Sequence, residues 1–199
     1  KENRPKINLF CGIGNNGGDG LALARLLLND GYEVEVYIVN FSDKRSDDFL
    51  LNLKRLKEHQ FWPEFINENS DLPELNQGEI VIDAIFGIGL NRPAEGWIKE
   101  LIQHINQSKS YVIAVDVPSG LYLDKAPEDP EAIINAETTI TFQLPKLVFF
   151  LPETAEFAGR VEIADIGLDR NFIAKTASEA NALAAFNAIF AAPTLFICP

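Results

Sequence analysis

Short apolar segments alternate with longer amphipathic segments along the chain. Residues 6–11 form a continuous apolar run, which is typical of a strand buried on both faces of a sheet. Residues 21–29 are rich in leucine and alanine and end at Asp30 and Gly31, which predicts a helix and its termination. This alternation favours an α/β fold with a mostly parallel central sheet and helices on both faces.

The same pattern continues to residue 166 without an internal repeat or a low-complexity linker. We expect further strands at 33–39, 61–66, 79–86, 111–117, 138–144 and 160–166, and further helices at 46–59 and 95–107. The chain is therefore interpreted as a single domain over residues 1–199. We assign no function to the tail at 170–199, and we expect its alanine-rich part, 174–192, to pack on the sheet as a helix.

The composition limits the classes of function. The chain of 199 residues has 17 Lys and Arg against 29 Asp and Glu, a net charge of −12, which argues against nucleic-acid binding. No apolar run reaches the roughly 18–20 residues needed to cross a bilayer, so we expect no membrane association. Two cysteines cannot form a disulfide framework, which favours a cytoplasmic protein. The absence of methionine, even at position 1, indicates a fragment.

Three polar segments follow apolar strands of the predicted sheet. They are GIGNNGGDG at 12–20, DAIFGIGLNRP at 83–93 and DVPSG at 116–120. Ligands of open α/β sheets bind beyond the carboxyl ends of the strands, where loops lead into helices. We therefore expect the three segments to converge on one edge of the sheet and to form the functional site.

The first segment contains the G-x-G-x-x-G pattern of dinucleotide-binding proteins, at Gly12, Gly14 and Gly17. These glycines permit positive φ angles and a close approach of backbone N–H groups to a phosphate. Asn15, Asn16 and Asp19 do not fit a plain nicotinamide-dependent dehydrogenase, because a carboxylate beside a pyrophosphate needs a cation or a hydroxyl partner. The alternative is structural: Asn15 adopts a left-handed conformation and Asp19 caps the helix.

The other two segments supply carboxylates and an arginine. Asp83 ends an apolar run, and Arg92 follows a glycine turn and is a candidate phosphate ligand, because its guanidinium can hold two oxygens. Asp116 ends the next apolar run and precedes the turn at 118–120. Two alternatives stay open here: Arg92 as a solvated surface residue, and Asp116 as a capping carboxylate.

Several catalytic motifs are absent. The sequence has no GxxxxGK[ST], GxSxG, HExxH or CxxC pattern, which argues against a P-loop enzyme, an α/β-hydrolase and the common zinc or thiol sites. The polar segments do contain the oxygen ligands that hard cations prefer, at Asn16, Asp83, Asp116 and Ser119. A hard-cation site therefore remains open.

Five blocks occur in a fixed order between residue 6 and about residue 168. They are GIGNNGGDGL at 12–21 with Ala24 and Arg25, DAIFGIGLNRP at 83–93, VDVPSG at 115–120, AETTITFQLPK at 136–146 and DIGL at 165–168. Together they resemble the YjeF N-terminal family, and specifically the NAD(P)H-hydrate epimerases.

The resemblance implies a Rossmann-like three-layer α/β/α sandwich and an isomerase. That enzyme interconverts the R and S forms of hydrated NADH and NADPH (NADHX and NADPHX), which repairs the nicotinamide cofactors. The resemblance also implies one potassium ion per subunit, held by Asn16, Asp83 and Ser119. The implied substrate-binding residues are Asn15, Asn16, Gly17, Gly18, Asp19, Gly87, Ile88, Gly89, Leu90, Asn91, Arg92, Pro93 and Asp116.

We expect Asp116 to be the catalytic residue. Inversion at C6 of the hydrated ring requires a group that moves a proton to or from the C6 hydroxyl, and Asp116 is an ionisable side chain at a central strand end. Lys146 follows the strand predicted at 138–144 and is either a second positive group of the site or a surface residue.

The resemblance also shapes the expected partners. Family members normally begin with a helical region that contributes to dimerisation; this chain lacks it, but we still expect a homo-oligomer. We also expect an ADP- or ATP-dependent dehydratase, fused or separate, as a functional partner. Two alternatives stay open: a non-catalytic YjeF-type nucleotide- or protein-binding module, and a dehydrogenase. The dehydrogenase is disfavoured because Asn40 follows the second predicted strand, where an acidic residue is expected.

Overall fold

The computed structural model describes residues 4–90, 93–123, 127–171 and 173. The predicted substrate-binding residues Asn91 and Arg92 lie outside the described residues, as does the helix predicted at 174–192. Everything below concerns the described part of the chain.

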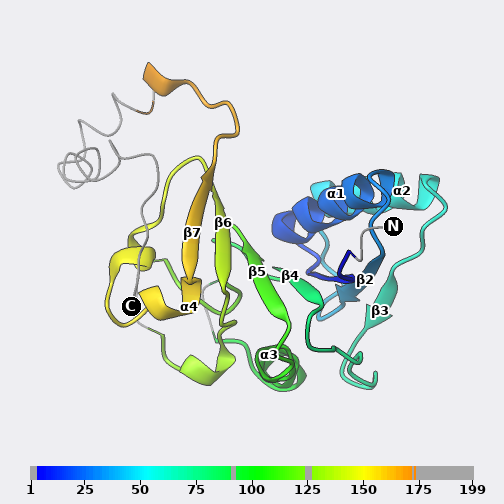
Figure 1. The fold of residues 1–199 in the computed structure, drawn as a ribbon, viewed down its shortest axis with the longest axis horizontal. Coiled ribbons are helices and arrows are strands. Elements are labelled where there is room, and N and C mark those ends of the chain that lie inside the picture. Colours follow the sequence, from blue (N-terminus) through cyan, green and yellow to red (C-terminus); the bar gives the residue numbers. More distant parts are fainter. Residues whose placement is uncertain (1–3, 91–92, 124–126, 172, 174–199) are drawn as a thin grey trace.

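The described residues form a seven-stranded sheet in which every neighbouring pair is parallel (Figure 1). The strand order is β3-β2-β1-β4-β5-β6-β7, so the first six strands have the order of a Rossmann fold. The strands are β1 (Ile7–Cys11), β2 (Val34–Val39), β3 (Glu64–Ile66), β4 (Ile80–Ala84), β5 (Tyr111–Val115), β6 (Thr138–Phe142) and β7 (Arg160–Ala164).

Three long helices complete the α/β/α layers. Helices α1 (Asn15–Asn29) and α2 (Asp47–Glu58) lie on one face of the sheet, and α3 (Trp97–Gln107) lies on the other (Figure 1). The core is correspondingly divided into a cluster beneath α1 and α2 and a second cluster beneath α3. The predicted Rossmann-like three-layer sandwich is therefore confirmed.

The buried centre of the sheet explains why the central strands are continuous apolar runs. All five residues of β1 are buried, because helices cover both of its faces. All seven predicted strands are present, with ends one to three residues shorter in most cases. Helix α2 begins one residue after Ser46, whose hydroxyl accepts a hydrogen bond from the Phe49 N–H at 3.2 Å.

A third, smaller core lies beside β5 and β6 and was not predicted from the sequence. It is built from the long segment after β5, which includes Ile133 just after η1 (Pro130–Ala132), together with the short helices η2 (Leu147–Phe150) and α4 (Ala155–Ala158). Val117 and Leu121 are buried in it on either side of Ser119. This core therefore fixes the loop that follows Asp116.

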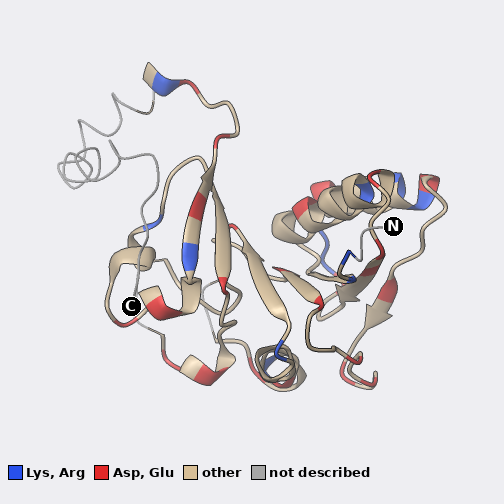
Figure 2. Ribbon diagram, viewed as in Figure 1, with Lys and Arg blue, Asp and Glu red and all other residues tan. Residues whose placement is uncertain are grey.

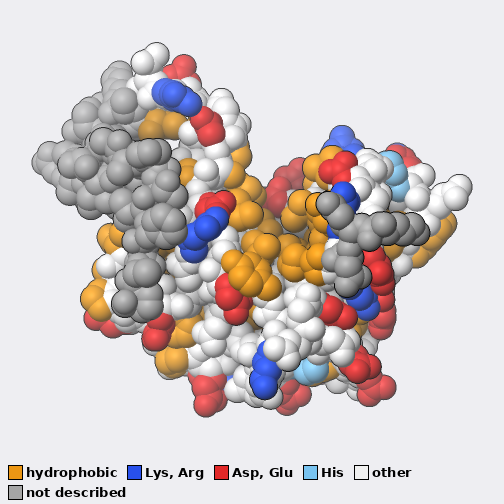
Figure 3. All heavy atoms as spheres, in the orientation of Figure 1, with side chains coloured by type: hydrophobic (Ala, Val, Ile, Leu, Met, Phe, Trp, Pro, Cys, Tyr) orange, Lys and Arg blue, Asp and Glu red, His pale blue; other side chains and the backbone are white. Residues whose placement is uncertain are grey.

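The surface carries scattered charge. Figure 2 shows acidic residues around the molecule and basic residues at separated points, without one basic face in this view. Figure 3 shows hydrophobic side chains gathered between β5 and β6 on one side and α1 on the other, and Ile140 and Leu26 are exposed. None of the described helices is both long and apolar enough to span a membrane.

Candidate functional site

The site lies where the strand order reverses. The chain runs outward from β1 to β2 and β3, then returns to place β4 on the other side of β1. The crossover helices after β1 and β4 therefore leave the sheet on opposite faces, which opens a crevice at the carboxyl ends of these two strands. Strand β5 is the next neighbour, so the three polar segments predicted from the sequence do converge on one edge.

The glycines of the first segment permit close backbone packing rather than unusual φ angles. A Cβ atom on Gly12 would lie 1.9 Å from the Ile85 carbonyl oxygen, and one on Gly17 would lie 1.8 Å from the Gly12 carbonyl oxygen. Neither residue has a positive φ angle. The positive φ angles that these glycines permit are therefore not used; glycine is needed because α1 starts directly against β1 and the loop after β4.

Helix α1 begins at Asn15, earlier than the predicted start at residue 21. The structural alternative for this segment is also wrong. Asn15 is helical rather than left-handed, and Asp19 lies within the second turn and does not cap the helix. The N-cap is Gly14, which has no side chain to satisfy the first N–H groups of the helix. Those N–H groups therefore remain available at the cavity that Gly14 and Asn15 line.

A buried network joins the residues predicted to hold the cation. Asp83 on β4 is fully buried; its Oδ2 accepts the Ser119 N–H at 2.7 Å and its Oδ1 accepts the Ser119 hydroxyl at 2.5 Å. The Ser119 Oγ accepts the Phe86 N–H at 2.8 Å, and the Asn16 amide donates to the Phe86 carbonyl at 2.9 Å. The structure thus brings Asn16, Asp83 and Ser119 together around the Phe86 backbone.

The electrostatics of Asp83 suit a cation ligand. Burial raises the pKa of this carboxyl to about 6, although hydrogen bonds from Ser119 and from the Ile85 N–H act in the opposite direction. Among the ion pairs of the described residues, none involves Asp83. The donor set around it consists of carboxylate, hydroxyl, amide and carbonyl oxygens, which are the ligands that hard cations prefer. No group of three His, Cys, Asp or Glu suited to a metal occurs in the described residues.

Asp116 has a conformation and surroundings of its own. It directly follows β5, is buried, and has a φ angle of 68°, which is uncommon for a residue other than glycine. Its Oδ1 accepts hydrogen bonds from the Thr141 hydroxyl at 3.3 Å, the Phe142 N–H at 3.2 Å and the Lys146 ammonium at 2.5 Å. Within the described part of the chain these bonds all end on Oδ1, so Oδ2 is the oxygen left for a ligand.

Lys146 therefore belongs to the site rather than to the open surface. Its side chain is 18% exposed, and it also donates to the Thr141 hydroxyl at 2.6 Å and to the Phe142 carbonyl at 3.3 Å. The sequence left its role undecided because the turn between Phe142 and Lys146 has no recognisable geometry. Only the folded chain shows that this turn brings the ammonium back over the end of β5.

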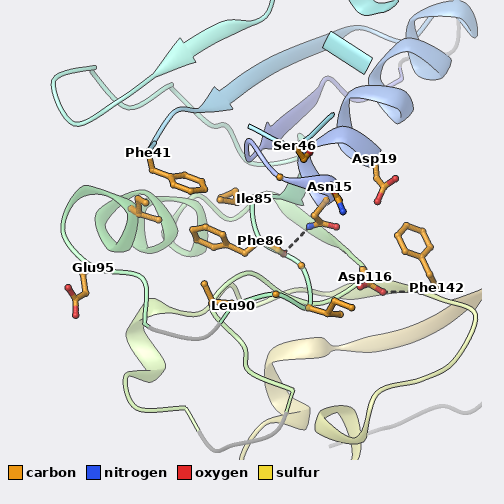
Figure 4. A pocket seen from close by; sticks show the side chains of 16 residues that line it. Asn15, Asp19, Phe41, Ser46, Ile85, Phe86, Leu90, Glu95, Asp116 and Phe142 are labelled. Carbon is orange, nitrogen blue, oxygen red and sulfur yellow. Dashed lines mark hydrogen bonds between the residues drawn. The ribbon is translucent and has the colours of Figure 1, made fainter. Parts of the chain in front are cut away.

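A cavity of about 820 Å³ lies at this edge of the sheet, which is within the usual range for a small-molecule site. Asn16 and Asp116 line it, whereas Asp83, Ser119 and Lys146 do not. The predicted substrate-binding residues that line it are Asn15, Asn16, Asp19, Gly87, Ile88, Gly89, Leu90 and Asp116 (Figure 4). Gly17, Gly18 and Pro93 do not line it; the two glycines are buried within α1, and Gly18 faces α2. The roles of all these residues remain predictions.

The pKa of the Asp19 carboxyl is raised, first by the loss of surrounding solvent and then by the nearby carboxylates of Asp116 and Asp48. Two carboxylates thus face the same cavity, and that of Asp116 disfavours the charged form of Asp19. The raised pKa favours the protonated form of Asp19, which can share its proton with a hydroxyl group of a ligand at this end of the cavity.

Several lining residues escaped the sequence analysis. Phe41, Ser46, Glu95, Ile98 and Phe142 line the cavity, although none belongs to the three polar segments. Phe41 follows the strand predicted at 33–39, Phe142 lies near the end of the strand predicted at 138–144, and the other three lie in the first turn of a predicted helix. Their position at the carboxyl edge of the sheet was therefore the available signal. Apolar side chains at such positions are not distinguishable from core residues by pattern alone.

The order of the sheet and the cavity at its switch point define a Rossmann-like protein with a nucleotide-sized site. The sequence profile of the family described as YjeF-related protein N-terminus matches residues 1–148. The chain therefore belongs to the YjeF N-terminal family.

Curated relatives agree with this membership. The chain is 40% identical over 177 residues to an NAD(P)H-hydrate epimerase of Anaerococcus prevotii, covering 86% of this chain and 79% of the relative. It is 37% identical over 166 residues to an NAD(P)H-hydrate epimerase of Oenococcus oeni, covering 83% and 76%. It is 38% identical over 165 residues to a bifunctional NAD(P)H-hydrate repair enzyme of Thermofilum pendens, covering 81% of this chain but 31% of that larger protein.

Proposed function

We propose that this chain is an NAD(P)H-hydrate epimerase, an isomerase that interconverts the R and S forms of NADHX and NADPHX. The observation that carries the proposal is the Asp116 carboxylate, which is held by Lys146 on the wall of a cavity at the switch point of a Rossmann-like sheet. The similarity to epimerases along most of their length supports the same activity.

Inversion at C6 breaks and remakes one bond of the carbinolamine carbon. In ring opening, Asp116 Oδ2 takes the hydroxyl proton, C6 becomes a carbonyl carbon, and the electron pair of the C6–N1 bond moves to N1. In the alternative, the protonated Asp116 gives its proton to the departing hydroxyl, and the N1 electron pair stabilises C6. Both routes need one group that transfers a proton in each direction, which is the role proposed for Asp116.

Lys146 is proposed to position this carboxylate. Its ammonium binds Oδ1 and the Thr141 hydroxyl, which holds the carboxylate by one oxygen and leaves Oδ2 for the substrate. A carboxylate held in place in this way is suited to exchange a proton with a bound hydroxyl.

Potassium is proposed as the cation, one per subunit, with Asn16, Asp83 and Ser119 as its ligands. The network through the Phe86 backbone supports this choice, because it gathers oxygen donors around the buried Asp83 carboxylate. Among the described residues, no basic side chain forms an ion pair with Asp83. When bound, the ion would offset the charge of Asp83 and join the loops after β4 and β5.

The rest of the proposal concerns the substrate and its surroundings. The segment from Gly87 to Pro93, including Asn91 and Arg92, is proposed to bind the substrate together with the start of α1. Because relatives of this chain include larger bifunctional repair enzymes, a dehydratase acting on the same substrate, fused or separate, is the proposed partner. We place the protein in the cytoplasm as a homo-oligomer.

The test is an exchange assay with purified protein. (R)-NADHX is incubated with the protein in potassium buffer, and the R and S forms are followed by NMR spectroscopy. Catalysed approach to the R/S equilibrium is expected, without any change in the total hydrate. Binding of NADHX without faster exchange would instead favour the non-catalytic module, and substrate-dependent oxidation of NADH would favour the dehydrogenase.

A further inference from the structure

The cavity has two ends of different chemistry. Asp19 and Asp116 lie at one end, beside Phe142, whereas Phe41 and Glu95 lie at the other (Figure 4). Phe86 lies between Phe41 and Leu90 in this view. The carboxylate end has two acidic groups that can act on a hydroxyl, whereas the other, aromatic end has a single lining carboxylate, that of Glu95.

The aromatic end is formed by two rings from different loops. Phe41 follows β2 and Phe86 follows β4, and their ring centroids are 5.1 Å apart with an angle of 51° between the planes. Because the rings are tilted, they do not close into a parallel stack. Phe41 remains 37% exposed and lines the cavity. An aromatic ring kept partly exposed on a cavity wall offers a flat apolar surface to a ligand.

The charge at this end selects a base over a phosphate. Glu95 lines the same end, and its carboxylate disfavours a phosphate group there. Asn15 at the start of α1 lies between the two ends in Figure 4, and the cavity is also lined by Gly87, Gly89 and the N-cap Gly14, which has no side chain to bond the first N–H groups of the helix. A dinucleotide extended along the cavity would thus have its phosphates in the middle and one base at each end.

We infer that Phe41 and Phe86 form the binding site for the adenine base of the substrate, opposite the nicotinamide end at Asp116. The inference rests on the proposed function, because the reacting ring must lie at Asp116. Phe41 then binds a part of the substrate that does not react. Such a contact is equally strong in the ground state and the transition state, so it lowers KM and leaves kcat unchanged.

The variants Phe41→Leu and Phe41→Tyr separate stacking from simple burial. Leucine keeps an apolar side chain but has no ring, whereas tyrosine keeps the ring. Base–aromatic stacking of this kind corresponds to a loss of roughly 5-fold to 100-fold in affinity when the ring is removed. We expect Phe41→Leu to raise the KM for (R)-NADHX by about that factor, with kcat retained, and Phe41→Tyr to behave like the wild type.

The decisive comparison uses a substrate without adenine. On hydrated reduced nicotinamide mononucleotide, Phe41→Leu and the wild type should have the same kcat/KM. Calorimetric titration should show weaker binding of AMP to Phe41→Leu and unchanged binding of reduced nicotinamide mononucleotide. Trp62→Leu is the matched control, because Trp62 is 67% exposed and lies outside the cavity lining; both affinities should stay at the wild-type value.

The inference is overturned if Phe41→Leu leaves the KM for NADHX unchanged, or if it lowers activity on the adenine-free substrate by the same factor. It is also overturned if the wild type acts equally well on both substrates. These failures differ from a failure of the proposed function, in which the wild type does not catalyse exchange on either substrate.

Discussion

Replacing Asp116 by asparagine removes a charge and a proton acceptor while keeping the shape of the side chain. The three donors to Oδ1, which are Thr141, Phe142 and Lys146, can still bond to an amide oxygen at that position. Asparagine also tolerates a positive φ angle, which Asp116 has at 68°. We therefore expect Asp116→Asn to fold with the same loops around the cavity.

The size of the effect on catalysis follows from the role of the carboxylate. Loss of a general acid–base group lowers the rate by about 10²-fold to 10⁴-fold, which corresponds to about 3–5 kcal/mol of activation free energy. The effect on stability is smaller. The Asp116 and Lys146 side chains are 11% and 18% exposed, and replacing a charged acceptor by a neutral one costs about 1 kcal/mol in the free energy of unfolding.

The assay compares R-to-S exchange of NADHX by the wild type, Asp116→Asn and the control Asp71→Asn, whose side chain is exposed in the segment before β4. The control should retain the wild-type rate. The reasoning is refuted if Asp116→Asn exchanges the hydrate at a rate close to that of the wild type with unchanged KM. Urea unfolding of the same samples shows whether a lower rate reflects lost folding instead.

Three further results are expected. Gly17→Ala should lower the free energy of unfolding in urea by about 2–4 kcal/mol, because its Cβ would lie 1.8 Å from the Gly12 carbonyl oxygen. The control Gly14→Ala should lower it by less than about 1 kcal/mol, because a Cβ at Gly14 meets nothing within 4 Å. Equal losses in the two variants would contradict the packing argument. Potassium chloride should raise the melting temperature of the wild type by several degrees over choline chloride at the same ionic strength, and Asp83→Asn should abolish the difference; a rise that persists in the variant would exclude this carboxylate as a ligand. Burial and neighbouring carboxylates raise the pKa of Asp19 above its ordinary value of 3.8. The folded protein therefore keeps the Asp19 proton to higher pH than the unfolded chain does, and the free energy of unfolding falls as pH rises from 3.8 through the folded pKa. Denaturation of the wild type and Asp19→Asn between about pH 4 and about pH 7 should show a steeper fall in the wild type, because the raised pKa of Asp83 contributes equally to both proteins; parallel curves would contradict the shift of Asp19.

The sequence by itself determined the class of fold and the edge of the sheet where the site lies. Strands such as β1 and β4 are short apolar runs buried on both faces, and this local property is visible in the pattern. The same runs end in unusual polar residues, so their convergence followed from the geometry of a parallel sheet. The blocks around Asp83 and Asp116 also carried the family resemblance.

Only the tertiary structure decided how the glycines act and where α1 begins. The first turn of α1 contains two asparagines and two glycines, which have low helix propensity, so the local sequence favoured a turn. Close packing of the helix start overrides that preference. Gly17 packs against the Gly12 backbone and Gly12 packs against the Ile85 backbone, and a larger residue at either position would collide with it.

The tertiary structure also decided the partners of Asp116 and the aromatic end of the cavity. Lys146 is 30 residues from Asp116 in the sequence, and Phe86 is 45 residues from Phe41. No periodic pattern reports such pairs, because each depends on how an irregular turn crosses the edge of the sheet. Hydrophobic patterning specifies which residues are buried, whereas the geometry of a site depends on long-range contacts between loops that the assembled sheet alone brings together.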